Sequence, residues 1–340
     1  MELHYKKIGI FGGSGYIGSN LASHLQKGVQ VRIIDVKPPA KRLGNVEYFR
    51  CDVRNFDEVK KAINGLDLVI HSAIVQIPRI NEKKCLGYEV NVIGTQNVCK
   101  AVDENKNIKG LLLTGTWHIM GEKEIDGMID ESFGYRPDKV EDRARLYAIS
   151  KLLQEGIVRY YDEMSDKIFG IIRMGTVLGE EMPKKTAANI FIEKGLKSQP
   201  ITPYKHSMYR PMLYVDIQDV CKAFKLFADK ILNNEIEKEN NSLYHIINVV
   251  YPEPITILQL AEMVRDVIIE LTGGKIRPSI EVIDKGLPSL FSRDDKNKFK
   301  ININKAIRIL GLKHLINPKE SIRHIVKRKL SKNKDSMCLN

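Results

Sequence analysis

Short runs of aliphatic and β-branched residues alternate with longer amphipathic stretches over residues 1–180, and this alternation constrains the fold more than any other feature. The strand-like runs are Lys7–Phe11, Gln30–Ile34, Val46–Cys51, Leu66–His71, Gly110–Thr114 and Ile168–Ile172. The helix-like stretches between them are Tyr16–Lys27, Val59–Asn64, Leu86–Asn105 and Arg143–Met164. Regular β–α–β alternation predicts an α/β fold with a doubly wound parallel sheet and helices on both faces.

The alternation weakens after residue 180, which indicates a second, smaller unit. Its expected elements are Ala187–Leu196 (helix), Met212–Val215 (strand), Ile217–Ile231 (helix), Tyr244–Val249 (strand), Ile255–Leu271 (helix), Ser279–Val282 (strand) and two C-terminal helices. We expect residues 1–180 to form a nucleotide-binding domain to which 212–250 return. Residues 181–330 would form an interleaved α/β substrate lobe, and 331–340 a basic tail. The polar segment Asp126–Asp142 is expected to be a loop over the active site.

A glycine-rich turn follows the first predicted strand and opens the first predicted helix. Gly12, Gly15 and Gly18 permit a tight turn, close approach of the backbone to a pyrophosphate, and close packing of helix on strand. The helix N-terminus then offers unpaired N–H groups to the phosphates. This strand–turn–helix context predicts a Rossmann-type dinucleotide site, in which Ser14, Tyr16 and Ile17 complete the turn.

Asp35 ends the second predicted strand, 17 residues beyond Gly18. A carboxylate at this position can accept both hydroxyls of an adenosine ribose and would repel a 2′-phosphate, so it favours NAD over NADP. Asp52 and Val53 follow the third strand, where an adenine edge would lie. Three neighbouring cations could soften the preference for NAD: Arg32, Lys37 and Lys41.

Composition excludes several classes of protein. The 43% of hydrophobic and 28% of charged residues are typical of a soluble globular chain, and no apolar run approaches the roughly 20 residues of a membrane helix. We find no signal-peptide pattern at the N-terminus and expect a cytoplasmic location. The five cysteines are scattered and suggest neither a disulfide framework nor a metal site.

The net charge of +12 comes largely from Lys-rich surface stretches and from residues 323–334. A solvated helix end explains the latter run. The chain lacks the aromatic-interleaved basic segments of nucleic-acid readers, so nucleic acid is not an expected partner. A membrane is not an expected partner either.

Tyr147 and Lys151 lie four residues apart in a helix-compatible stretch, which places both side chains on one face. A tyrosine pKa near 10 makes a poor base at neutral pH. A neighbouring ammonium group and an oxidised nicotinamide both stabilise phenolate, and so bring Tyr147 into a useful range for acid–base chemistry.

Taken together, these residues resemble the extended short-chain dehydrogenase/reductase family, in its NAD-dependent epimerase/dehydratase branch. The resemblance covers residues 7–325. Its supports include GGSGYIG, Asp35, CDV at 51–53, HSA at 71–73, NVIGT at 91–95, LLLTGTWHIMG at 111–121, YAISK, RMGTVLG at 173–179 and RPMLYVDIQDV at 210–220. KAIRILG at 305–311 is similar to the near-C-terminal helix of the family.

The resemblance implies roles for particular residues. Thr116 would hydrogen-bond the reacting oxygen, Tyr147 would move the proton, and Lys151 would hold the nicotinamide ribose. Asn91 matches the asparagine near the nicotinamide loop. Further cofactor contacts would come from Ser72, Ala73, Thr114 and Met174. Substrate contacts would come from Asn189 and Arg210 at a diphosphate, with Arg293 a second arginine, and from Thr116, His118 and Thr176.

Some positions depart from the family pattern. Dehydratases of the family carry an Asp-Glu pair directly after the catalytic Thr, where this chain has Trp117-His118, so elimination of water is disfavoured. Thr176 replaces an expected asparagine. His118 is either an additional acid–base group or a hydrogen-bonded lining of the pocket.

The leading hypothesis is an NAD-dependent sugar-nucleotide epimerase, most similar to UDP-glucose 4-epimerases. The alternative is an NAD(P)-dependent reductase or dehydrogenase acting on a keto-sugar nucleotide or another small carbonyl. A third interpretation is an inactive NAD-binding regulatory protein, but Thr116, Tyr147 and Lys151 are all present. The helices at Leu86–Asn105 and Arg143–Met164 match those that build a homodimer interface in the family.

Overall fold

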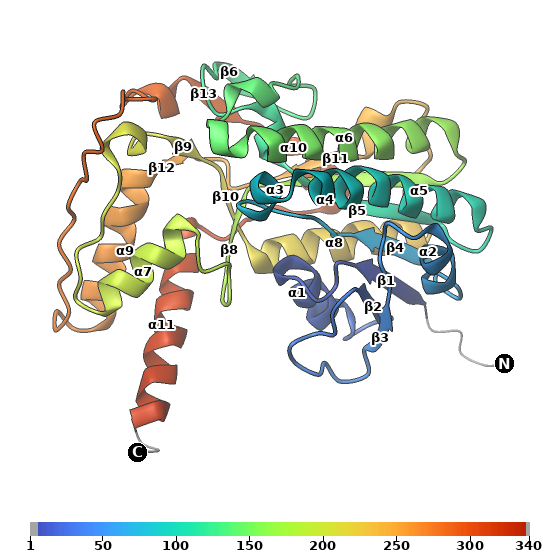
Figure 1. Ribbon diagram of the computed structural model, residues 1–340, viewed down its shortest axis with the longest axis horizontal. Coiled ribbons are helices and arrows are strands. Elements are labelled where there is room, and N and C mark those ends of the chain that lie inside the picture. Colours follow the sequence, from blue (N-terminus) through green and yellow to red (C-terminus); the bar gives the residue numbers. More distant parts are fainter. Residues whose placement is uncertain (1–5, 338–340) are drawn as a thin grey trace.

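A seven-stranded parallel sheet forms the centre of the molecule (Figure 1). The computed structural model describes the backbone of residues 6–337 and the side chains of residues 6–332. The spatial order is β11–β7–β5–β4–β1–β2–β3, and all neighbouring pairs are parallel. The bounds are β1 Lys7–Phe11, β2 Gln30–Asp35, β3 Glu47–Arg50, β4 Leu68–His71, β5 Gly110–Thr116, β7 Ile168–Met174 and β11 Ile246–Val249. The predicted doubly wound Rossmann-type fold is confirmed. The order reverses between β1 and β4, where the carboxyl ends of strands leave a crevice for a ligand.

Helices cover both faces of this sheet. One face packs against α1 (Tyr16–Leu25), α8 (Ile217–Leu232) and α10 (Asn304–Leu310). The other packs against α2 (Phe56–Ala62), α5 (Gly94–Glu104) and α6 (Asp142–Met164). Because α8 and β11 belong to this layered unit, residues 217–249 lie with the first half of the chain.

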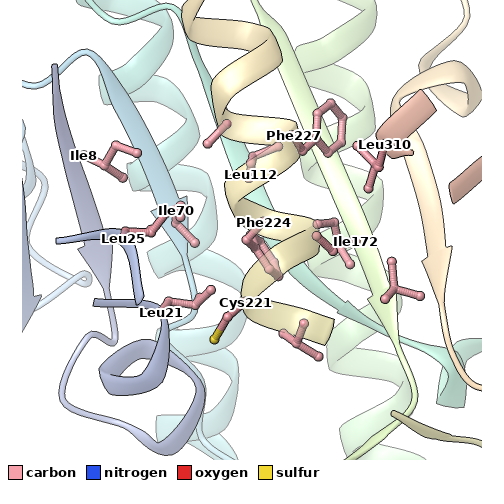
Figure 2. Close-up of a cluster of buried hydrophobic side chains, with 14 of the residues drawn as sticks. Ile8, Leu21, Leu25, Ile70, Leu112, Ile172, Cys221, Phe224, Phe227 and Leu310 are labelled. Carbon is pink, nitrogen blue, oxygen red and sulfur yellow. The ribbon is translucent and has the colours of Figure 1, made fainter. Parts of the chain in front are cut away.

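Large apolar side chains fill the space between α8 and the strands. Figure 2 shows Phe224 and Phe227 of α8 pointing toward Leu112 and Ile172 of the sheet. Both phenylalanines are fully buried, which stabilises the fold by roughly 2–3 kcal/mol for each ring. Gly170 of β7 leaves room for this packing, because a Cβ there would lie 2.7 Å from the Phe227 ring.

A smaller lobe has its own apolar core, at the left of Figure 1. Its helices are α7 (Ala187–Leu196), α9 (Ile257–Leu271) and α11 (Pro318–Met337), and α9 packs against both of the others. Three two-stranded sheets accompany them: parallel β8 (Thr176–Leu178) with β10 (Tyr214–Asp216), antiparallel β9 (Pro211–Met212) with β12 (Ile255–Thr256), and parallel β6 (Gly127–Ile129) with β13 (Phe299–Ile301).

Local signals explain where several helices begin and end. Thr256 and Gln259 form a reciprocal capping box at the start of α9. The Asp216 side chain accepts a hydrogen bond from the Gln218 N–H at the start of α8. Gly311, at φ +70°, ends α10 in the left-handed conformation.

The structure corrects several sequence predictions. The predicted helix Leu86–Asn105 is present as α4 (Lys84–Tyr88) and α5, which a π-helical turn at Glu89–Ile93 joins without a break, and a separate short helix, α3 (Arg79–Glu82), precedes it. The predicted loop at Asp126–Asp142 contains strand β6, because residues 127–129 pair with the distant β13. Ser279–Val282 is not a strand and makes one isolated bridge, between Ile201 and Ile280. The predicted strand Met212–Val215 is divided between β9 and β10.

Short 3₁₀-helical turns connect several of these helices and strands. The 3₁₀ turns are η2 (Trp117–Met120), η3 (Pro137–Lys139), η4 (Lys205–Ser207), η5 (Ser242–His245) and η6 (Asp295–Asn297). Residues 331–337, expected to form a basic tail, continue α11, and 338–340 lie outside the described residues.

Within residues 6–337, no helix combines the length and apolar character that crossing a bilayer requires. The same residues contain no cluster of three or more acidic, His or Cys groups placed to hold a metal ion. Four cysteines are unpaired, and Cys338 lies outside the described part.

Candidate active site

The glycine turn closes tightly onto the end of β4. Gly12 has φ +72°, and a Cβ on it would lie 2.5 Å from the Ala73 nitrogen and 2.7 Å from the Ser72 carbonyl carbon. A Cβ on Gly18 would lie 2.4 Å from the Gly12 oxygen. Gly15 precedes α1 and provides no side-chain cap, so the N–H groups at this helix end remain available to an anion.

Asp35 is fixed beside this turn. Its carboxylate accepts hydrogen bonds from the Ser14 N–H (3.1 Å) and the Lys37 N–H (3.1 Å). The Arg32 guanidinium instead donates to the Ala62 and Asn64 carbonyls, and Lys41 pairs with Glu181. The side chains of Arg32 and Lys41 therefore hydrogen-bond to groups other than Asp35.

The remaining predicted cofactor residues lie around the same edge. Asp52 pairs with Arg54 at 2.7 Å, and hydrogen bonds from Arg54 lower the pKa of the Asp52 carboxyl. Val53 is buried. On α1, Ile17 is half-buried, and the buried Tyr16 hydroxyl has no hydrogen-bond partner among the described residues.

Asn91 lies in the π-helical turn and is fully buried. Its side chain accepts a hydrogen bond from the Val75 N–H (2.7 Å) and donates to the Val75 carbonyl (3.1 Å) and the Ser150 hydroxyl (3.0 Å). The amide therefore ties the segment after β4 to α6, and its hydrogen-bonding groups are used within the protein.

Thr116, Tyr147 and Lys151 meet at the carboxyl edge of the sheet. Burial raises the pKa of the Tyr147 phenol, whereas hydrogen bonds with Gln76 and Thr116 act in the opposite direction. Lys151 donates to the Thr114 carbonyl at 2.7 Å, and burial lowers its pKa to about 7. The fold thus assembles the three residues that the sequence grouped. Met174, which pairs in register with Thr116, is buried at the end of β7.

A buried charge cluster adjoins this group. His118 Nδ1 lies 3.1 Å from Thr116 Oγ1, and His118 Nε2 lies 3.2 Å from Glu122 Oε1. Arg210 pairs with Glu122 and, at 3.1 Å, with Glu141. Although burial favours the neutral acid, the Arg210 and His118 partners lower the pKa of Glu122 to about 2.

The other predicted substrate residues occupy varied surroundings. Thr176 is half-buried on β8, and its N–H donates to the Leu213 carbonyl at 2.6 Å. Asn189 is buried in the first turn of α7 and donates to the Lys184 carbonyl at 3.3 Å. Arg293 is exposed on the segment before β13.

Sequence reasoning missed Gln76, Glu122 and Glu141. Glu122 and Arg210 are 88 residues apart, and no local motif marks such a pair. The one available signal was the proximity of Glu122 to His118, since residues four apart in a helical turn can meet.

A Rossmann-type sheet, a glycine turn beside Asp35 and a Thr–Tyr–Lys group at the carboxyl edge are the features of a dinucleotide-binding enzyme. The chain belongs to the NAD dependent epimerase/dehydratase family, whose model matches residues 8–243. The family assignment made from the sequence is confirmed, and NAD is the cofactor of this family.

Several curated proteins are similar to parts of this chain. An uncharacterized protein, y4nG of Sinorhizobium fredii, is 31% identical over 50% of this chain and 41% of its own length. A putative UDP-glucose 4-epimerase of Methanocaldococcus jannaschii is 26% identical over 70% of this chain and 80% of its own length. A short-chain dehydrogenase/reductase family 42E member 1 of Danio rerio is 36% identical over 38% of this chain and 34% of its own length. The first and last of these relatives are thus matched over less than half of their length.

Solved structures share the fold. The UDP-glucose 4-epimerase of Thermus thermophilus in complex with NAD has a TM-score of 0.74 and 23% identity, covering 94% of this chain and 98% of that one. MoeE5 in complex with UDP-glucuronic acid and NAD has a TM-score of 0.76 and 19% identity, covering 96% and 99%.

Proposed function

We propose that this chain is an NAD-dependent epimerase of a sugar nucleotide. The observation that carries the proposal is the meeting of Thr116, Tyr147 and Lys151 at the sheet edge beside the glycine turn. Tyr147 would take the proton of a sugar hydroxyl, Thr116 would hydrogen-bond the same oxygen, and Lys151 would stabilise the phenolate. When bound, NAD would supply reversible hydride transfer at the carbon that bears this hydroxyl.

The residues present fit NAD. The contact of Gly12 with Ala73 leaves no room for a side chain, and the uncapped N-terminus of α1 faces the turn. Asp35 is held by the Ser14 N–H in a position that suits the ribose hydroxyls. We assign the adenosine end to Asp35, Asp52 and Val53.

Two features support a diphosphate-bearing substrate. The structurally similar MoeE5 was solved in complex with UDP-glucuronic acid and with UDP-glucose. The Nε of Arg210 is buried and has no partner among the described residues, so it remains free to donate to an oxyanion. In this proposal residues 181–330, apart from the segment 217–249 that lies with the central sheet, form the substrate lobe, with Asn189 and Arg210 at the phosphates of the substrate.

A net dehydrogenase or reductase is the second candidate, and the pairing of Arg210 favours it. Glu122 and Glu141 already balance the guanidinium charge. A diphosphate would have to compete with these two carboxylates, whereas an uncharged carbonyl substrate would not.

The deciding experiment follows the nicotinamide absorbance of purified holoenzyme with UDP-, GDP-, dTDP- and CDP-sugars, together with thermal shifts. An epimerase keeps its NAD and interconverts sugars without net absorbance change; a dehydrogenase turns over added NAD. Tyr147→Phe should abolish hydride transfer and leave NAD bound. No shift with any sugar nucleotide would reject the substrate class.

We further propose a homodimer formed through α4, the following π-helical turn and α6. Large apolar side chains are exposed there: Tyr88 (57%), Ile93 (40%), Leu153 (41%), Tyr160 (69%) and Met164 (56%). Burying this face against a second copy would remove it from water. Sedimentation velocity should show a dimer that Tyr160→Glu weakens, and a monomer at all concentrations would reject this interface.

The unpaired cysteines accord with a reducing, cytoplasmic compartment.

A further inference from the structure

Thr116, His118 and Glu122 form a row of hydrogen-bonding groups beside Tyr147. Thr116 Oγ1 lies 3.1 Å from His118 Nδ1, and His118 Nε2 lies 3.2 Å from Glu122 Oε1. The His118 and Tyr147 rings meet edge to face, with centroids 5.9 Å apart. The Glu122 side chain is completely buried, whereas that of His118 keeps 17% exposure.

Charge fixes the direction of these hydrogen bonds. Glu122 is held as a carboxylate by Arg210 and can only accept, so His118 Nε2 must carry a proton. In a neutral imidazole, Nδ1 is then an acceptor, and the Thr116 hydroxyl donates to it. The oxygen of Thr116 keeps a lone pair that can accept from Tyr147.

We propose that His118 acts through Thr116 as a positioning and proton-relay residue for Tyr147, with Glu122 as its fixed counter-charge. This rests on the proposed hydride-transfer function. After Tyr147 has taken the proton of the substrate hydroxyl, its O–H bond breaks as a new O–H bond forms on Thr116. The original Thr116 proton passes to His118 Nδ1, which leaves phenolate on Tyr147 and imidazolium on His118.

Several charged groups surround this relay. Tyr147 reaches it from α6, and Glu122 from the segment after η2. Arg210 and Glu141 lie behind Glu122. From η3, the Lys139 carbonyl accepts the Glu122 N–H at 2.8 Å, while its ammonium group pairs with Glu124.

The kinetic test measures single-turnover hydride transfer in holoenzyme with UDP-glucose across pH. His118→Gln keeps a hydrogen-bonding amide that cannot titrate. We expect a rate loss of about 10²-fold, because the amide cannot take up the proton that Thr116 passes on. A wild-type rate in this variant would overturn the proposal.

Glu122→Gln and Glu141→Gln form a matched pair, because both remove a carboxylate from Arg210 and only Glu122 contacts His118. Loss of the Glu122 carboxylate removes the counter-charge of the imidazolium that the relay forms, so the rate of hydride transfer should fall more in Glu122→Gln than in Glu141→Gln. Equal losses in both variants would contradict the relay.

A second readout does not depend on activity. Nitrogen-15 NMR of histidine-labelled holoenzyme, with His118 assigned by its absence in His118→Gln, should show a protonated Nε2 and a bare Nδ1 at high pH. A proton on Nδ1 would refute the relay. If UDP-glucose supports no hydride transfer, the substrate proposal fails while this measurement still decides the role of His118.

Discussion

Lys151 should destabilise the cofactor-free fold at neutral pH, and Lys151→Met should relieve this cost. The side chain is only 5% exposed, and burial lowers its pKa to about 7. The negative charge of Glu155 acts in the opposite direction but does not cancel the effect of burial. Methionine has a similar length and no charge, so the substitution removes the ionisation with little change in packing.

The magnitude follows from linkage between protonation and folding. The pKa of Lys151 lies about 3.5 below the ordinary value of 10.5, and each pH unit corresponds to about 1.4 kcal/mol. The buried Lys151 ammonium group therefore lowers the free energy of unfolding by at most about 5 kcal/mol below pH 7. Between about pH 7 and 10.5 the unfolded chain binds more protons than the native one, so wild type gains stability relative to the variant as pH rises.

Urea unfolding of both cofactor-free proteins between pH 6 and 10 measures this difference. We expect the difference in free energy of unfolding, by which wild type is less stable than Lys151→Met, to decrease by up to about 1.4 kcal/mol per pH unit above pH 7. Lys60→Met serves as the control for removal of a lysine side chain, since the Lys60 side chain is 49% exposed. A constant difference between wild type and Lys151→Met would refute the reasoning.

Three further predictions concern the cofactor end and the core. Gly12→Ala should lower the melting temperature more than Gly15→Ala. Gly12 has φ +72° and a Cβ on it would meet Ala73, whereas a Cβ on Gly15 would meet nothing closer than 3.2 Å. The left-handed backbone conformation at Gly12 alone costs a residue with a Cβ about 1–2 kcal/mol. Glu155→Gln should cost about 3–5 kcal/mol in urea unfolding, because it leaves the fully buried Arg173 guanidinium without its counter-charge; an unchanged midpoint would contradict this. Asp35→Ser should raise the affinity for NADP relative to NAD by about tenfold in calorimetry, since it removes repulsion of the 2′-phosphate; an unaltered ratio would show that Asp35 does not set the preference.

Elements in the first half were predictable because their signals are local. The apolar runs of β1, β2 and β4 and the glycine turn at Gly12 each carry their own pattern, and the structure reproduces them. The four-residue spacing of Tyr147 and Lys151 likewise places both on one face of α6. These features depend on neighbours within a few residues.

Tertiary structure alone decided the pairing of residues 127–129 with β13, because each segment is too short to signal a strand by itself. It also decided the surroundings of Arg210. The sequence shows that Arg210 carries a positive charge but does not show its partner. Only the fold brings Glu122, which is 88 residues away, into contact with Arg210. The sequence by itself determined the Rossmann core and the placement of Tyr147 and Lys151 on one helix face, whereas long-range packing determined the electrostatics of the pocket, because charges interact through space and not along the chain.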